Sequence, residues 1–313
     1  MLSRWPNLKI AVMIPCLNEE ASIEAVVNEV RHQLPESQIY VYDNASTDGT
    51  MKAALNSGAI VRSEPKRGKG NVVRRMFADI EADIFILVDG DLTYDLSGLS
   101  THINVLINGC LDMVIGSRKS TLRESYRPGH IFGNKAFNYL FGIIFGAKFI
   151  DIFSGYRVMT CRFVKTFSAI TSGFEIETEL SVHALELRIA TRELEVAYRG
   201  RMEGSVSKLN TIRDGIAILI AICNLFRTTA PMQFYSLISF CLAVSSFALG
   251  YPLITYYIDT GLVPRVPTSI LASALMILSG LGLMSGLILD KLSLLRRDLK
   301  RLELLRYNIP FLA

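Results

Sequence analysis

The chain has 313 residues, of which 50% are hydrophobic and 20% charged, and its formal net charge is +4. This composition is too apolar for an ordinary soluble enzyme. The modest charge, without arginine and aromatic side chains interleaved in the N-terminal part, argues against a nucleic-acid partner. The five cysteines form no Cys-x-x-Cys pair and the four histidines are dispersed, which argues against a zinc site and a disulfide framework.

Residues 1–115 alternate between strand and helix patterns. Short apolar runs predict strands, and apolar residues repeating every three to four positions predict helices. Strands are predicted at 8–14, 38–42, 59–62 and 84–88, helices at 23–30 and 72–80, and a short helix after the turn at 46–49. This order of elements predicts an α/β open sheet.

The apolar run at 84–88 ends on two carboxylates one residue apart, Asp89 and Asp91. Ligands of open α/β sheets collect just beyond the carboxyl ends of such buried strands. Hard oxygen ligands at this edge suit Mg²⁺ or Mn²⁺, which take one or two carboxylates from a protein and the rest from water and phosphate. Taken alone, the Asp-Gly step is more typical of a turn at a strand end.

Polar side chains also follow the first two predicted strands. The first strand ends in Pro15, Asn18 and Glu19, and the second ends in Asp43 and Asn44. These clusters recur on the same edge of the predicted sheet as the two carboxylates. We therefore expect a nucleotide to lie along this edge.

Two long apolar segments occupy the C-terminal part. No charged residue occurs between Arg227 and Asp259 or between Arg265 and Asp290, so each window can supply the ~20 apolar residues that cross a bilayer. We predict transmembrane helices at about 233–258 and 267–289, against the alternative of buried core helices. The predicted parts are an N-terminal domain at 1–210, an amphipathic interfacial helix at 211–230, a membrane hairpin at 231–290 and a basic tail at 291–313.

Basic residues are concentrated after the second predicted span. Six lysines and arginines lie within residues 291–306, whereas the linker between the spans carries only Asp259 and Arg265. By the positive-inside rule, we expect the N-terminal domain and both termini on the cytoplasmic side of the cell membrane. The N-terminal apolar run at 10–14 is too short for the core of an export signal.

Five motifs in order make the chain resemble the inverting family 2 glycosyltransferases with the GT-A fold: residues 14–20, 43–50, 66–70, 89–91 and 116–118. The match continues through 151–157, 174–179 and 204–208. With the two membrane helices, the pattern is similar to the polyprenyl-phosphate glycosyltransferases, the dolichol-phosphate mannose and glucose synthase group. The resemblance implies inverting transfer of one sugar from a nucleotide-sugar, with a UDP-sugar favoured and GDP-mannose as the alternative, to dolichyl or undecaprenyl phosphate.

The resemblance also implies groups of site residues. Those expected around the donor are Pro15, Asn18, Glu19, Asp43, Asn44, Lys69, Gly70 and Asp89. Asp89 and Asp91 are expected to hold Mg²⁺ or Mn²⁺. The catalytic candidates are Asp89, Asp91, Arg118, Glu175 and Glu177. The candidates for the acceptor phosphate are Arg118, Arg201, Ser205, Ser207 and Lys208.

Several of these assignments have alternatives. Gly68 and Gly70 would let backbone approach a phosphate that Lys69 neutralises, but a solvated basic turn has the same composition. Glu175 and Glu177 also fit an acidic helix start, in which Glu175 would share a face with Glu179. Many relatives carry Asp-Asp at 43–44 and Gln at position 93, so Asn44 and Thr93 leave the base and the sugar open.

Two other functions fit parts of the pattern. A processive polysaccharide synthase would carry a Gln-x-x-Arg-Trp motif, whereas the one tryptophan of this chain is Trp5. A catalytically silent, sugar-nucleotide-binding scaffold would be signalled by loss of the metal carboxylates, and Asp89 and Asp91 are both present. A small-residue face at 279–286 would permit membrane helices to approach closely and so permits a homo-oligomer.

Overall fold

The computed structural model describes residues 5–120, 137–139, 141–146, 149–168, 171–173, 175–199 and 211–308. The chain divides into two compact units. One unit consists of Met1–Ile222 together with Lys300–Ala313, and the other is Cys223–Leu299. The candidate site lies in the first unit, and the apolar helical hairpin makes up the second.

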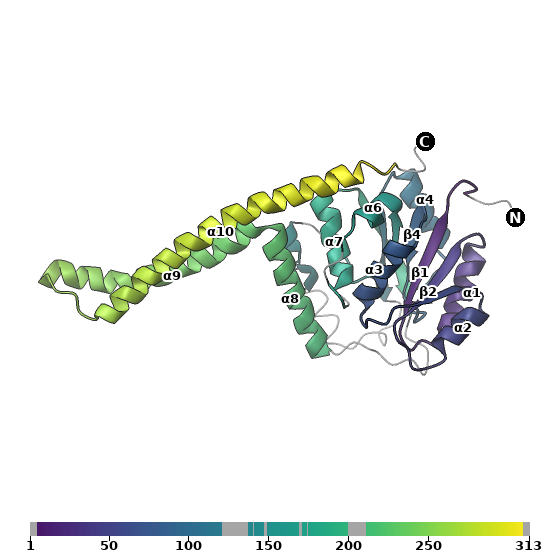
Figure 1. Ribbon diagram of the computed structural model, residues 1–313, viewed down its shortest axis with the longest axis horizontal. Helices are drawn as coiled ribbons and strands as arrows, with labels where there is room; N and C mark the ends of the chain where they lie inside the picture. Colours follow the sequence, from purple (N-terminus) through teal and green to yellow (C-terminus); the bar gives the residue numbers. More distant parts are fainter. Residues whose placement is uncertain are drawn as a thin grey trace. The chain divides into compact units, whose positions relative to one another are not determined.

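Within the described residues, the first unit contains a seven-stranded sheet of order β3-β2-β1-β4-β6-β5-β7 (Figure 1). Its strands are β1 (Ile10–Cys16), β2 (Gln38–Asp43), β3 (Ile60–Ser63), β4 (Ile84–Leu87), β5 (Met113–Ser120), β6 (Arg157–Thr160) and β7 (Thr191–Tyr198). Strands β1 to β4 run parallel, β5 and β7 pair in parallel, and β6 runs antiparallel to β4 and β5. The predicted α/β open sheet is confirmed, with an antiparallel strand that the residue pattern did not indicate.

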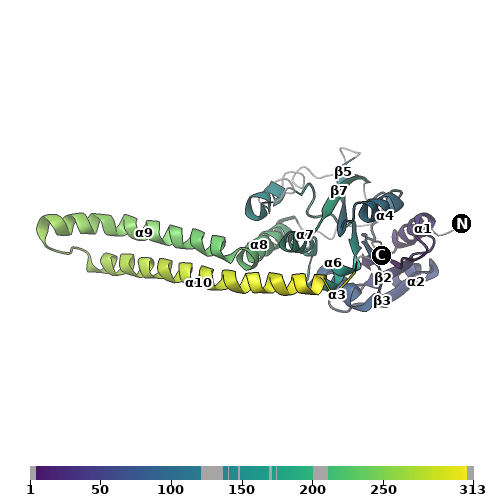
Figure 2. The same ribbon diagram turned by 90° about the horizontal axis from the view of Figure 1, so that it is seen from above.

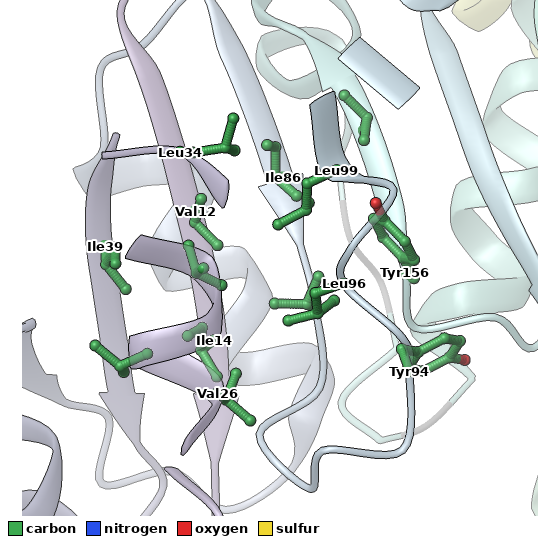
Figure 3. Close-up of a cluster of buried hydrophobic side chains, with 14 of the residues drawn as sticks. Val12, Ile14, Val26, Leu34, Ile39, Ile86, Tyr94, Leu96, Leu99 and Tyr156 are labelled. Carbon is green, nitrogen blue, oxygen red and sulfur yellow. The ribbon is translucent and has the colours of Figure 1, made fainter. Parts of the chain in front are cut away.

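Successive residues of the central strands supply two separate hydrophobic cores, because alternate side chains of a strand point to opposite faces. Val12 and Ile14 of β1 pack with residues of α1 (Ile23–Gln33) and α4 (Leu99–Asn108). Figure 3 shows this cluster, with Val12, Ile14 and Val26 labelled. Ala11 and Met13 belong to the opposite core, formed with α3 (Lys69–Asp79), α6 (Cys161–Thr166) and α7 (Ile176–Leu187).

The parallel strands bring the predicted polar clusters to one edge of the sheet. The amide of Asn44, just after β2, donates to the carbonyl of Cys16 at the end of β1 (2.8 Å). The short helix α2 (Thr50–Asn56) then begins beyond the loop at 43–49. Because β1 also pairs in parallel with β4, the ends of all three strands lie together. The prediction that these motifs share an edge is confirmed.

Three long helices follow: α8 (Thr211–Thr229), α9 (Pro231–Thr260) and α10 (Val266–Leu304). By length and composition, α9 and α10 could each cross a membrane. Both predicted spans lie inside these helices. The boundary predicted between hairpin and tail at 290 falls within α10, which continues as helix to Leu304.

Helices α9 and α10 lie side by side (Figure 2) and contact one another through small residues. Ser279 Oγ donates to the carbonyl of Ser239 (2.8 Å). A Cβ atom at Gly282 would stand 2.4 Å from Ser239 Oγ, and one at Gly286 would stand 3.0 Å from Tyr235 Cβ. Most of the small-residue face predicted to permit association between chains is therefore used within this chain, and a homo-oligomer stays a prediction.

Candidate active site

Asp89 lies just beyond β4, at the carboxyl edge of the sheet. Its carboxylate packs against the backbone of Gly155, where a Cβ atom would stand 2.3 Å from Oδ2 and 2.8 Å from Oδ1. The side chain of Asp89 keeps an exposed fraction of 26%. The carboxylate thus reaches the surface from a position that leaves no room for a side chain at 155.

Gly90 brings the end of β4 against the end of β1. A Cβ atom on Gly90 would stand 2.7 Å from Cys16 Sγ. The carbonyl of Gly90 accepts a hydrogen bond from Ser22 Oγ (2.6 Å), one residue before α1. Gly90 is therefore needed for close approach, which gives the Asp-Gly-Asp sequence a tertiary role beyond that of a strand-end turn.

Asp91 is buried, with an exposed fraction of 5%. Its Oδ1 accepts hydrogen bonds from Thr93 Oγ1 (2.6 Å) and from the amide of Thr93 (3.3 Å). Between them, Leu92 adopts a positive φ of 56°. The hydroxyl and the amide of Thr93 thus orient the carboxylate of Asp91.

Lys69 lies between two carboxylates. Its Nζ donates to Asp89 Oδ1 (2.5 Å) and to Glu177 Oε1 (2.6 Å). Burial opposes the charged form, but the charges of Asp89 and Glu177 outweigh it and raise the pKa of Lys69 above its ordinary value. Burial also raises the pKa of Glu177, a shift that the ammonium of Lys69 opposes. Lys69 is thus part of a buried ionic cluster, and its contact with a donor phosphate stays a prediction.

The glycines beside Lys69 serve a close approach of two backbone segments. A Cβ atom at Gly68 would stand 2.1 Å from the carbonyl oxygen of Ser172, and one at Gly70 would stand 2.5 Å from that of Thr171. The amide of Gly70 donates to the carbonyls of Ser172 (3.0 Å) and Gly173 (3.1 Å). Residues 171–173 therefore occupy the space where side chains at 68 and 70 would lie, and a contact of Gly70 with the donor stays a prediction.

Asp43 and Asn44, after β2, have different surroundings. The side-chain Nδ2 of Asn44 donates to the carbonyls of Glu64 (2.9 Å) and Lys66 (2.8 Å). Its Oδ1 accepts from the backbone amide of Gly68 (2.7 Å). The side chain of Asn44 therefore holds the loop at 64–68. Asp43 is 2% exposed, and its buried Oδ1 has no hydrogen-bond partner among the described residues.

Asn18 and Glu19 connect the end of β1 to the loop after β2. Asn18 Oδ1 accepts from the amide of Thr47 (2.8 Å), and the amide of Glu19 donates to Thr50 Oγ1 (2.8 Å). Asn18 adopts a positive φ of 51°, where asparagine is among the better tolerated side chains. Pro15 lies within β1, paired with Tyr42. Pro15, Asn18 and Glu19 thus all lie at the same edge of the sheet, and their contact with a nucleotide-sugar stays a prediction.

Arg118, near the end of β5, forms a bidentate ion pair with Asp151. Its Nε and Nη2 donate to the two carboxylate oxygens at 2.6 and 2.7 Å. Burial would raise the pKa of Asp151, but the charge and hydrogen bonds of Arg118 outweigh it and hold that pKa below its usual value. The guanidinium also lies over the ring of Tyr198, 5.6 Å from its centroid. Asp151 therefore fixes the orientation of the guanidinium predicted to contact the acceptor.

The remaining predicted residues divide into two groups. Glu175 is the N-cap residue of α7, which supports the helix-start interpretation, although its side chain makes no capping hydrogen bond. Glu179 Oε2 accepts a hydrogen bond from Thr171 Oγ1 (2.8 Å). The acceptor candidates Arg201, Ser205, Ser207 and Lys208 lie outside the described residues.

The prediction of individual site residues missed Arg157 and Tyr94. Arg157 is completely buried, and burial lowers its pKa to about 10. Tyr94 Oη accepts from the amide of Gly155 (2.9 Å) and so supports the backbone beneath Asp89. Arg157 lies in a motif singled out at 151–157, but an arginine in a sequence gives no sign that it is buried.

Asp89 and Asp91 fit a divalent cation by the chemistry of their donors, since carboxylate oxygens are the ligands that Mg²⁺ and Mn²⁺ take. Among the residues that the structure describes, there is no group of three or more His, Cys, Asp or Glu side chains that could hold a metal ion. The two carboxylates suit a cation that keeps water and phosphate oxygens as its other ligands.

Three comparisons relate the chain to known proteins. The model of glycosyl transferase family 2 matches residues 11–167. Glycosyltransferase AglJ of Haloferax volcanii is 32% identical over 304 residues, which cover 94% of this chain and 97% of AglJ. Protein RfbJ of Shigella flexneri is 50% identical over 127 residues, 40% of this chain and 98% of RfbJ.

Among solved structures, the glucosyl-3-phosphoglycerate synthase of Mycobacterium tuberculosis in complex with Mn²⁺, UDP-glucose and phosphoglyceric acid matches with a TM-score of 0.58. The match covers 71% of this chain and 81% of that chain at 19% identity, so it bears on the fold alone. The family match includes β1 to β4, the Asp-Gly-Asp motif and Arg157. The chain therefore belongs to glycosyl transferase family 2 and is a glycosyltransferase of the GT-A fold.

Proposed function

We propose that this glycosyltransferase moves one sugar from a nucleoside diphosphate to the phosphate of a membrane polyprenol, with inversion at the anomeric carbon. The observation that carries the proposal is the apolar surface of α9 and α10. Their most apolar windows have mean hydropathies of 1.9 and 2.0, yet only 11% and 17% of those windows are buried. Exposed apolar helices of this length suit a bilayer, where a lipid-linked acceptor is found.

Helix α8 supports the same location. Ile216, Leu219 and Ile220 have exposed fractions of 55%, 44% and 56%. An amphipathic helix with such a face suits the interface between lipid and water. The basic residues after the second span favour an arrangement in which the catalytic part and both termini are cytoplasmic.

The donor is proposed to be a nucleotide-sugar, with a UDP-sugar favoured. The unpartnered Oδ1 of Asp43 is a buried acceptor, and a buried polar atom without a partner costs about 1–3 kcal/mol. A pyrimidine or purine N–H would satisfy it. The synthase of similar fold was solved with UDP-glucose and Mn²⁺, and we propose the same classes of donor and cation for this chain.

Each group has a proposed part in the transfer. The acceptor phosphate, with a second pKa near 6, is mostly dianionic at neutral pH and needs little help from a base. Arg118, oriented by Asp151, is proposed to bind that phosphate together with Arg201, Ser205, Ser207 and Lys208. Asp89 and Asp91 are proposed to hold Mg²⁺ or Mn²⁺, which when bound offsets the charge that develops on the leaving diphosphate.

The test is transfer of radiolabel from a panel of UDP- and GDP-sugars into the organic phase. Detergent-purified full-length protein would be mixed with polyprenyl phosphate and Mg²⁺ or Mn²⁺. We expect a single donor to label the lipid, and we expect Asp91→Ala to abolish labelling while the exposed Glu36→Gln control keeps it. A protein that binds a nucleotide-sugar but labels no lipid with any donor would refute the proposed acceptor.

A further inference from the structure

An ion pair between two buried side chains, Lys69 and Glu177, joins the first turns of two helices at the candidate site. Lys69 is the first residue of α3, and Glu177 is the second residue of α7. The side chains of Lys69 and Glu177 have exposed fractions of 9% and 5%, and the lysine bridges from Glu177 to Asp89. Of the three side chains, Asp89 is the most exposed.

We propose that Lys69 is a positioning residue for Asp89, and that Glu177 is the counter-ion holding Lys69 in place rather than a catalytic base. The proposal rests on the part given to Asp89 in the proposed function. A general base must lie within hydrogen-bond reach of the proton that it removes. Glu177 is 4% exposed, and its Oε1 is bonded to the ammonium of Lys69.

The backbone holds Lys69 and Glu177 together. The 171–173 segment, just before α7, packs on Gly68 and Gly70, the two neighbours of Lys69. The amide of Gly70 donates to the carbonyls of Ser172 and Gly173. These hydrogen bonds hold the start of α3 against the segment that leads into α7, and the two glycines allow the close approach.

Arg157 fixes Glu177 from the other side. Its Nη2 donates to the carbonyl of Glu177 (2.8 Å) and to Ser181 Oγ (3.0 Å). Its Nε donates to the carbonyl of Ser154 (3.1 Å), in the loop that carries Gly155. One buried guanidinium therefore holds both the helix that carries Glu177 and the loop on which Asp89 packs.

These contacts leave the Asp89 carboxylate little freedom. Lys69 holds Oδ1, and the backbone of Gly155 lies against both oxygens. Residues that orient a metal-binding group from outside the ligand set are typically worth 10–100-fold in metal affinity or activity. Loss of the Lys69 ammonium would also leave Asp89 and Glu177 as two close, unneutralised carboxylates.

The experiment measures binding of UDP and of GDP, each with Mn²⁺, by calorimetry on the full-length protein without acceptor. We expect Lys69→Met and Glu177→Gln each to weaken binding of the preferred nucleotide by at least about tenfold. Because both act through the same contact, we expect the double variant to bind no more weakly than Lys69→Met alone.

Asp112→Asn is the matched control. Asp112 is also a buried carboxylate in an ion pair, with Arg162, but it directly precedes β5 and so lies at the opposite edge of the sheet. We expect this variant to have a lower melting temperature and an unchanged nucleotide affinity. A loss of nucleotide affinity in Asp112→Asn equal to that in Glu177→Gln would mean general destabilisation and would overturn the proposal.

Two further results would overturn it. Wild-type nucleotide affinity in Glu177→Gln, combined with loss of sugar transfer, would make Glu177 a base. A second double variant, Lys69→Met/Glu177→Met, controls for misfolding, because a protein often tolerates the replacement of a buried ion pair by apolar side chains. Wild-type affinity in that variant would exclude a positioning role. The binding measurements contain no acceptor, so their outcomes are independent of whether polyprenyl phosphate is the substrate; only the measurement of sugar transfer requires an acceptor.

Discussion

Gly155→Ala is the substitution that most directly tests the packing of Asp89. The added Cβ atom would stand 2.3 Å from Oδ2 and 2.7 Å from Cγ of Asp89, where ordinary contacts begin at 3.4 Å. Gly155 does not have a positive φ, so alanine suits its backbone conformation. The clash with the carboxylate is therefore the effect to be expected.

The carboxylate is expected to move rather than the loop. The amide of Gly155 is held by Tyr94 Oη, and Ser154 Oγ donates to the carbonyl of Gly116 (2.5 Å). Arg157 holds the carbonyl of Ser154. The Asp89 carboxylate must shift by about 1 Å, and a misplacement of that size can cost about a hundredfold in rate.

The assay is the initial rate of sugar transfer at saturating donor and Mn²⁺, with the melting temperature measured in parallel. Gly98→Ala is the matched control, because its Cβ atom would meet only ring atoms of His102 at 3.6 Å. We expect Gly98→Ala to stay within about twofold of wild type. A Gly155→Ala variant with most of the wild-type rate would refute the reasoning, since Asp89 would then tolerate displacement.

Three other predictions follow from the packing. Gly286→Ala should cost about 1–3 kcal/mol of hairpin stability, because its Cβ atom would stand 3.0 Å from Tyr235 Cβ of α9, whereas Gly280→Ala, with no atom within 4 Å, should not; thermal unfolding in detergent compares them. Asn44→Asp should cost about 1–3 kcal/mol, because it places an acceptor against two carbonyl oxygens, and an unchanged melting temperature would contradict this. The lowered pKa of Asp151 means that its pairing with Arg118 stabilises the fold above about pH 4 and is lost as pH falls through the folded pKa. Asp151→Asn should therefore flatten the acid limb of stability against pH, and an equally steep limb in both proteins would exclude this pair as its cause.

The position of the polar clusters at one edge of the sheet was predictable, because each cluster directly follows its strand in the sequence. An apolar run followed by carboxylates marks a strand end, and parallel strands bring their ends together whatever their side chains. The structure places Gly90 against Cys16 and joins Asn18 to Thr47, as that reasoning requires. The two long apolar helices were predictable for the same reason, since their signal is contained in each segment.

The partners of Lys69 were not predictable from local pattern. Glu177 lies 108 positions further along the chain, and nothing near Lys69 indicates that its ammonium is buried. The same holds for Gly68 and Gly70, whose residue types indicate close approach but not what approaches. Arg157 belongs to the motif at 151–157, and only its surroundings show that it joins a loop to a helix.

The sequence by itself determined the family, the order of strands from β1 to β4, the carboxylates after β4 and the two apolar spans, because the signal of each is contained in short segments of the chain. The tertiary structure alone decided that Lys69 bridges Asp89 to Glu177 and that residues 171–173 fill the space beside Gly68 and Gly70. It also decided that small residues of α10 pack against α9. These contacts join segments far apart in sequence. Their geometry follows from how the strands and helices pack, which no local pattern records.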